Sequence, residues 1–174
     1  MPYKKPIRTR ALVVVAGAAA PAATMVTPAQ AAVPPAGATF QISTGFDGKT
    51  LCISSTRTDL DYPVYPLTDC NKSDSAQQWR RTDNGRSIKN VGTGLCIAAD
   101  SVIANNCERA RPGELMWQQD GKGRMWTPTS DVFHQAYRIY WGNSTHVDGP
   151  RLTFPSGYNN DIPQGASVYV FNEI

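Results

Sequence analysis

The side chains of this 174-residue chain that are best suited to chemistry are four cysteines, two histidines and a few carboxylates. Cysteines form disulfides or bind metal ions, and a zinc site needs closely spaced cysteines and histidines. The chain has no Cys-x-x-Cys pair, and His134 and His146 both lie well beyond the last cysteine. We therefore expect two structural disulfides and no metal site. Four cysteines allow three pairings.

No group of residues has the spacing of a catalytic site. Asp131 lies three residues before His134, but no serine or cysteine nucleophile in a recognisable turn accompanies them. Glu108 and Glu114 could form a glycosidase pair, but both fall in a polar stretch that is typical of a solvated loop. Gly92-Thr93-Gly94 is too short for a phosphate-binding loop. We expect a protein that is not an enzyme and needs no cofactor.

Two segments repeat one pattern of glycine, cysteine, tryptophan and a Gly-Arg pair. In both, a glycine lies four residues before the first cysteine, and the Gly-Arg pair follows the tryptophan by six residues. Such a repeat indicates that the chain is built from similar structural units. Each copy contains two cysteines, so we expect pairing within each copy. The positions are Gly48, Cys52, Cys70, Trp79 and Gly85-Arg86 in copy one, and Gly92, Cys96, Cys107, Trp117 and Gly123-Arg124 in copy two. The predicted bridges are Cys52 with Cys70 and Cys96 with Cys107.

Residues 1–31 have the pattern of a cleaved signal peptide. A basic start precedes an apolar run, and Ala29-Gln30-Ala31 has the form of a signal-peptidase site. The apolar run is interrupted by Pro21 and is shorter than the roughly 20 residues that span a bilayer. We expect a secreted, extracellular protein without a membrane span, in which residues 32–37 form a flexible lead to one domain over residues 38–174. Secretion also favours disulfides, because the compartment is oxidising.

The charge of the remaining chain excludes one class of partner. The full chain has 17 Lys and Arg against 14 Asp and Glu, and residues 1–31 hold four of the basic residues and no acidic one. The remainder is therefore close to neutral and has no cluster of basic residues in sequence. We expect no binding to nucleic acid.

Short apolar segments separated by glycine and asparagine turns predict an all-β protein. No segment keeps a helical apolar period for more than a turn or two. Many short strands with such turns favour a barrel or a sandwich. The predicted strands are residues 39–42, 50–54, 64–68, 78–81, 87–90, 95–98, 102–104, 116–118 and 125–127.

The spacing of aromatic residues predicts a third copy without cysteines. Phe154 follows Trp117 at about the interval that separates Trp117 from Trp79, so we expect these three rings to fill a shared core. An alternative register opens the copy at residues 145–148, but it leaves too little chain to finish the repeat. The favoured strands are 132–135, 137–141, 151–154 and 167–171, with turns at Gly142-Asn143 and Asn159-Asn160.

With these motifs the chain resembles the ricin B-type lectin family, whose repeats carry a Gln-x-Trp motif. Gln77-Gln78-Trp79 matches it fully, whereas Leu115-Met116-Trp117 and Leu152-Thr153-Phe154 are progressively weaker matches. The resemblance covers residues 38–174 and implies a β-trefoil of three four-stranded repeats. It also implies carbohydrate binding.

The sugar-binding positions of that family are not kept in the first two copies. The family places an aspartate two residues after the first cysteine and an aromatic residue two before the second. Copy one has Ser54 and Thr68 at these positions, and copy two has Ala98 and Asn105. We expect these copies to serve as scaffold.

Copy three is the better candidate for a degenerate sugar site. Trp141 falls near the stacking position that the resemblance implies, next to Tyr140, with Asn143 and Asp148 as hydrogen-bonding groups. Alternatively, Tyr140 and Trp141 straddle a strand, one inside and one on the surface. The predicted function is secreted, non-catalytic binding of a glycan or polysaccharide. The alternative is a secreted β-trefoil scaffold for protein interaction or inhibition, without sugar binding.

Overall fold

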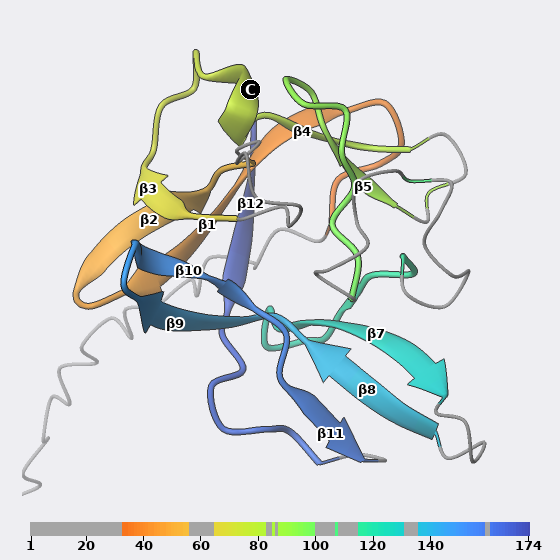
Figure 1. Ribbon diagram of the computed structural model, residues 1–174. Coiled ribbons are helices and arrows are strands. Elements are labelled where there is room, and N and C mark those ends of the chain that lie inside the picture. Colours follow the sequence, from red (N-terminus) through yellow and green to blue (C-terminus); the bar gives the residue numbers. More distant parts are fainter. Residues whose placement is uncertain are drawn as a thin grey trace, which may run out of the picture.

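The computed structural model describes residues 33–55, 65–82, 85, 87–99, 107, 115–130, 136–158 and 161–174. These residues form strands and one short 3-10 turn, which confirms the all-β prediction (Figure 1). The predicted signal peptide, the strands predicted at 102–104 and 132–135, and the turn at 159–160 lie outside the described residues. The elements are β1 Thr39–Phe46, β2 Lys49–Ile53, β3 Leu67–Asp69, η1 Ser75–Gln77, β4 Trp79–Arg81, β5 Ile88–Asn90, β6 Gln118–Gln119, β7 Met125–Ser130, β8 Ala136–Tyr140, β9 Gly142–His146, β10 Gly149–Thr153, β11 Ser156–Tyr158 and β12 Tyr169–Glu173.

Three antiparallel sheets carry these strands. The largest has the order β3-β2-β1-β4-β5, and β12 also pairs with β1, so the last strand lies against the first. A second sheet has the order β11-β8-β7-β6, and β9 pairs with β10 in a third. In Figure 1, β7, β8 and β11 extend away from the sheet around β1. Of these strands, β8 and β11 lie within the predicted third copy, and β7 directly precedes it.

Both predicted disulfides are present. Cys52 bonds to Cys70 and Cys96 bonds to Cys107, with Cα atoms 5.0 and 5.1 Å apart. Each bridge closes a short loop within one copy, and such a bridge stabilises a domain by roughly 3 kcal/mol through its effect on the unfolded chain.

The first two copies position their tryptophans in the same way. The indole nitrogen of Trp79 donates to the carbonyl oxygen of Ile53 at 3.0 Å, and that of Trp117 donates to Ile97 at 2.6 Å. Ile53 and Ile97 each follow the first cysteine of their copy. Both indole rings are buried. The sequence repeat therefore corresponds to a repeated packing arrangement.

The third copy uses Tyr169 in the place of these tryptophans. Trp79 pairs with Asn90 of β5, the strand that leads into copy two. In copy one, Ser43 lies opposite the first cysteine, Cys52; in copy two, Lys89 lies opposite Cys96. Asn90 follows Lys89 as Thr44 follows Ser43, so Asn90 and Thr44 are equivalent positions. Thr44 in turn pairs with Tyr169 of β12. The Tyr169 hydroxyl lies 3.1 Å from the Gly142 carbonyl oxygen, in a place like that of the indole nitrogens near Ile53 and Ile97, and shares its one proton between this oxygen and Asn143 Oδ1.

The prediction that Phe154 is the third equivalent ring is therefore wrong. Strands β8 and β9 pair with β11 and β10 in one continuous register, which places Phe154 opposite Trp141. Leu67 lies opposite Ile53 in the same way in copy one. In copy three the second strand continues from β8 into β9 and pairs in one register with β11 and β10, so a constant interval in sequence falls on a different strand.

The core is a continuous cluster of buried rings and aliphatic side chains from all three copies. Trp141 lies between Trp117 and Tyr169, with ring centroids 5.0 and 5.1 Å away and edge-on geometry. Phe154 is partly buried and packs against this cluster near Tyr65 and Trp117. These aromatic contacts stabilise the shared core in addition to the apolar area that they bury.

Candidate functional site

The structure does not bring the predicted sugar-binding rings to the surface. Tyr140 is buried, and Trp141 has 0% of its surface exposed. The interpretation of Trp141 as a stacking ring is therefore corrected, because no part of the ring is accessible to a ligand. The alternative, in which one of the two rings faces outward, is also wrong. The chain passes from β8 into β9 at Trp141, and protein covers both sides of the strand at this point.

The two polar residues of the predicted site lie apart from each other. The Asn143 amide nitrogen donates to the Thr44 hydroxyl at 3.0 Å, and its oxygen accepts from the Tyr169 hydroxyl at 2.6 Å. Asn143 therefore joins β9 to the core. Asp148 lies at the exposed turn between β9 and β10, with its carboxylate 3.9 Å from His146 Nδ1. The four predicted residues do not form one site.

The three positions at which ricin B-type lectins carry a sugar-binding aspartate have no exposed polar side chain here. Ser54 and Ala98 are buried, and Gly142 follows Trp141 as these residues follow Ile53 and Ile97. A Cβ atom at Gly142 would lie 2.5 Å from the carbonyl oxygen of Gly165, so no side chain fits there. Asn105 and the four residues weighed as catalytic candidates, Asp131, His134, Glu108 and Glu114, lie outside the described residues.

The glutamine of the Gln-x-Trp motif is fully used inside the protein. The Gln77 oxygen accepts from the Gln41 amide and from the Asn71 backbone N–H. Its nitrogen donates to the Thr68 hydroxyl and to the Asp69 carbonyl oxygen. A side-chain amide has two acceptor and two donor positions. Gln77 therefore has a structural role and no capacity left for a ligand.

An exposed pair of rings lies elsewhere in copy three. Tyr137 on β8 and Tyr158 on β11 are directly opposite each other, with ring centroids 5.8 Å apart. Tyr158 is 57% exposed, and Tyr137 is half-buried. We call this pair the tyrosine platform. In Figure 1 it belongs to the strands that extend away from the core sheet.

Two residues with hydroxyl groups lie on the same face of the sheet as the tyrosine platform. Thr129 of β7 lies opposite Tyr137 on its other side, and Ser156 is two residues before Tyr158. Side chains directly opposite one another, or two apart on one strand, face the same side of a sheet. The face therefore combines two rings with the hydroxyls of Thr129 and Ser156. On the other face, the Arg138 guanidinium lies 4.4 Å from the Trp126 ring centroid and stiffens the β7–β8 pair.

Sequence reasoning placed Tyr137 in a strand but did not connect it with Tyr158. The signal in the sequence is weak, because the two tyrosines are brought together only by the register of β8 with β11. Their separation along the chain gives no indication of that register.

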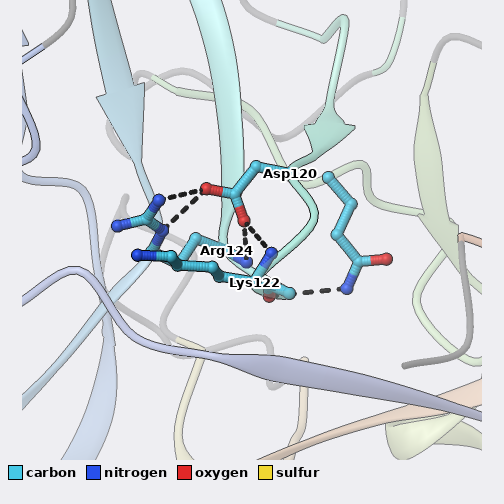
Figure 2. A network of polar contacts seen from close by, with 5 residues as sticks. Asp120, Lys122 and Arg124 are labelled. Atoms are coloured by element: carbon cyan, nitrogen blue, oxygen red, sulfur yellow. Dashed lines mark hydrogen bonds and ion pairs between the residues drawn. The ribbon is translucent and has the colours of Figure 1, made fainter. Parts of the chain in front are cut away.

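The turn between β6 and β7, at the end of copy two, holds a charged network (Figure 2). The Asp120 carboxylate accepts from the Arg124 guanidinium at 2.7 Å and from the backbone N–H groups of Lys122 and Arg124, both at 2.9 Å. Partial burial raises the pKa of Asp120, but these hydrogen bonds outweigh it and hold the pKa below its ordinary value. The network closes the turn that joins β6 to β7.

Burial also affects two phenols of the core. It raises the pKa of Tyr65 and of Tyr169 far above the ordinary value for tyrosine. The Tyr65 hydroxyl donates to the Cys96 carbonyl oxygen at 2.9 Å. Both phenols are therefore neutral hydrogen-bond donors that hold the core together.

The described residues hold neither a cluster of metal-ligating side chains nor a membrane-spanning helix. Histidine, cysteine and acidic side chains do not gather in groups of three or more at any described position. Among the same residues, no helix has the length and apolar character needed to cross a membrane. Comparison with known proteins adds no relative, since no family model matches the chain and no curated protein matches it significantly.

Proposed function

We propose that this chain is an exported, non-catalytic carbohydrate-binding protein with a ricin-type β-trefoil fold. The observation that carries the proposed activity is the tyrosine platform, which offers exposed rings beside hydroxyl groups. A pyranose has an apolar face that stacks on such rings and hydroxyls that need hydrogen-bond partners. Stacking removes apolar area from water, which contributes about 25 cal/mol per Å².

Three features support the proposed fold. The bonds from Trp79, Trp117 and Tyr169 to the second strands are alike in the three copies. The last strand pairs with the first, as it must in a closed barrel. Finally, the chain keeps the repeat of cysteines and the Gln-x-Trp motif that the family shares.

Export is supported by the signal-peptide pattern together with both disulfides. The bridges fit an extracellular protein, since disulfides persist in oxidising compartments.

Titration of the mature protein with galactose, arabinose, xylose and their neutral oligomers tests the activity. We expect tyrosine fluorescence and NMR shifts at the platform to change, with weak affinity because the site is open. Tyr158→Ala should abolish binding, whereas Tyr158→Phe should retain it, because stacking needs the ring and not the hydroxyl. Val147→Ala, at a side chain that is 90% exposed in the β9–β10 turn, is the control and should bind normally.

The second candidate is a secreted scaffold for protein interaction or inhibition. The observation that favours it is that Ser54, Ala98 and Gly142 replace the aspartate of the family's sugar sites. If no saccharide binds the wild-type protein, the carbohydrate proposal fails and the scaffold takes its place.

A further inference from the structure

Two hollows meet at Arg81, at the junction of copies one and two. The first has a volume of about 400 Å³, and the second has a volume of about 470 Å³. Small-molecule sites span about 300–1,000 Å³. Besides Arg81, the described residues that line the first, here called the cationic hollow, are Arg80, Thr82, Lys89, Asn90 and Val91. Those that line the second, here called the amide hollow, are Val33, Trp117, Gln118, Gln119, Asp120 and Gly121.

We propose that these two hollows together bind an acidic saccharide, with the carboxylate in the cationic hollow and the hydroxyls in the amide hollow. This inference rests on the proposed function only for the class of ligand. The site itself is separate from the tyrosine platform.

The cationic hollow places like charges side by side. Arg80 of β4 and Lys89 of β5 are directly opposite each other in the antiparallel register, and both are exposed. Like charges at such positions destabilise a sheet unless an anion lies between them. The short distance between opposite side chains suits one carboxylate that accepts from both.

Among the described residues, Arg80 and Lys89 have no carboxylate partner, and only Arg80 has a side-chain hydrogen bond. Arg80 donates from one terminal nitrogen to the Thr39 hydroxyl at 3.1 Å. The Lys89 ammonium makes no hydrogen bond or ion pair with any described residue, although its backbone takes part in the sheet. No acidic side chain is among the described residues that line this hollow. An anionic ligand would supply the missing negative charge.

Arg81 forms the boundary between the two hollows. Its Nε donates to the Gly85 carbonyl oxygen at 2.6 Å, which fixes the direction of the guanidinium. Gly85 adopts a φ of 67°, a left-handed conformation that suits glycine. The local turn therefore holds Arg81 where a ligand could contact both sides.

The amide hollow is suited to hydroxyl groups. The Gln118 side chain is exposed, and its amide makes no hydrogen bond to the described residues, so the amide offers both donors and an acceptor. Gln119 donates to the Tyr169 carbonyl oxygen at 3.1 Å, which leaves its amide oxygen as an acceptor. The Asp120 carboxylate is bound by Arg124, so its charge is neutralised and does not oppose an anionic ligand (Figure 2). Trp117 is almost fully buried and lies beneath these groups.

Cations in one hollow and free amide groups in the other together favour a sugar acid over other anions. An inorganic anion would use the cationic hollow and leave the amides without partners. An acidic peptide carries carboxylates but lacks the closely spaced hydroxyls that the glutamine amides match. A uronic acid residue offers both groups within the span of one or two rings.

Calorimetric titration of the mature, disulfide-bonded protein with trigalacturonate tests the proposal. We expect binding that weakens as salt rises, since exposed charges are screened. The double variant Arg80→Gln/Lys89→Gln should weaken binding by about tenfold or more, because two charge-assisted contacts are lost. Lys49→Gln removes an exposed lysine from β2 as a matched control and should bind as the wild type does. The double variant should melt no lower than the wild type, because its change removes repulsion.

Four outcomes would overturn the proposal. They are absence of trigalacturonate binding, unchanged affinity in the double variant, equal binding of the neutral methyl ester, and equal binding of poly-glutamate or inorganic phosphate. The last would identify a site for acidic peptides or simple anions. Tyr137→Ala/Tyr158→Ala should leave trigalacturonate binding intact. If neutral sugars bind nowhere while trigalacturonate still binds, the tyrosine platform fails and this site stands.

Discussion

Copies one and two differ from copy three in how they are held together and in what they expose. Each of the first two has a disulfide and a tryptophan whose indole donates to the residue after the first cysteine. Copy three has no cysteine and uses the Tyr169 hydroxyl in place of an indole, and its paired strands β8 and β11 carry the tyrosine platform. Loss of the covalent bridge thus accompanies additional strand pairing and exposed rings. The same packing arrangement therefore accommodates either an indole or a phenol at equivalent positions.

The largest expected effect tests whether Tyr169 is the third equivalent ring. Trp79→Ala and Tyr169→Ala should each destabilise the protein by roughly 3–5 kcal/mol, because both create a cavity in the core. Phe154→Ala should cost less, since this ring is only partly buried. Denaturant unfolding of the three variants measures the order. An equal or larger loss at Phe154 would contradict the assignment of Tyr169.

Loss of a disulfide in copy one or two should lower the free energy of unfolding about as much as loss of a core ring. Replacing Cys52 and Cys70 by serine should cost about 2–5 kcal/mol, the range for small secreted domains. Thermal unfolding of the double variant measures the loss. Peptide mapping without reduction should recover only the pairs within copies, and a fragment that joins the two copies would argue against the repeat.

A smaller loss of stability should distinguish Trp79 from Trp141, because only one of the two indoles has a hydrogen-bond partner. Trp79 donates to Ile53, whereas the Trp141 indole nitrogen is buried and has no hydrogen-bond partner in the described part of the chain. Trp79→Phe leaves a buried carbonyl without its donor, which costs roughly 1–3 kcal/mol beyond the loss of volume. Trp141→Phe removes an unpaired donor and should cost less. Equal losses in urea unfolding would show that the Ile53 bond contributes little.

The smallest effect concerns the turn around Asp120. The pKa of Asp120 is lower in the folded protein than in the unfolded chain, so the ionised carboxylate stabilises the fold. This contribution is fully present above the unfolded value of about 4 and is lost as the pH falls through the folded-state pKa. Asp120→Asn should lower stability at neutral pH by less than about 1 kcal/mol, because the pair is near the surface. Stability that depends on pH in the same way in wild type and variant would contradict this role.

The parts of the fold that depend on local sequence were predictable. Turn glycines and short apolar segments placed most described strands of the first two copies, and the repeat alone gave the cysteine pairing, which is confirmed. Positions that depend on pairing between distant strands were not predictable. The interval in sequence predicts Phe154, but the register of β8 and β9 with β11 and β10 places Phe154 opposite Trp141, and Tyr169 on β12 takes the equivalent position.

The predicted stacking ring, Trp141, lies in the copy that carries the tyrosine platform and has the same parity along the strand as Tyr137, but it is buried. Alternation along residues 137–141 suggested that one of Tyr140 and Trp141 faces outward, yet both are buried where β8 passes into β9. Tyr137, the ring of the tyrosine platform on this strand, lies three residues before Tyr140 in β8. Its partner on β11 comes from a register that the sequence does not encode in any short motif.

One measurement tests most directly whether copy three carries the carbohydrate-binding surface. Neutral oligosaccharides of galactose, arabinose and xylose are titrated into the isotope-labelled mature protein, and backbone amide shifts are followed by NMR. The account predicts shifts over residues 137–139 and 156–158, around the tyrosine platform, with the amides of Ser54 and Thr68 unchanged. Shifts confined to Ser54 and Thr68, or no shifts with any of these sugars, would contradict it.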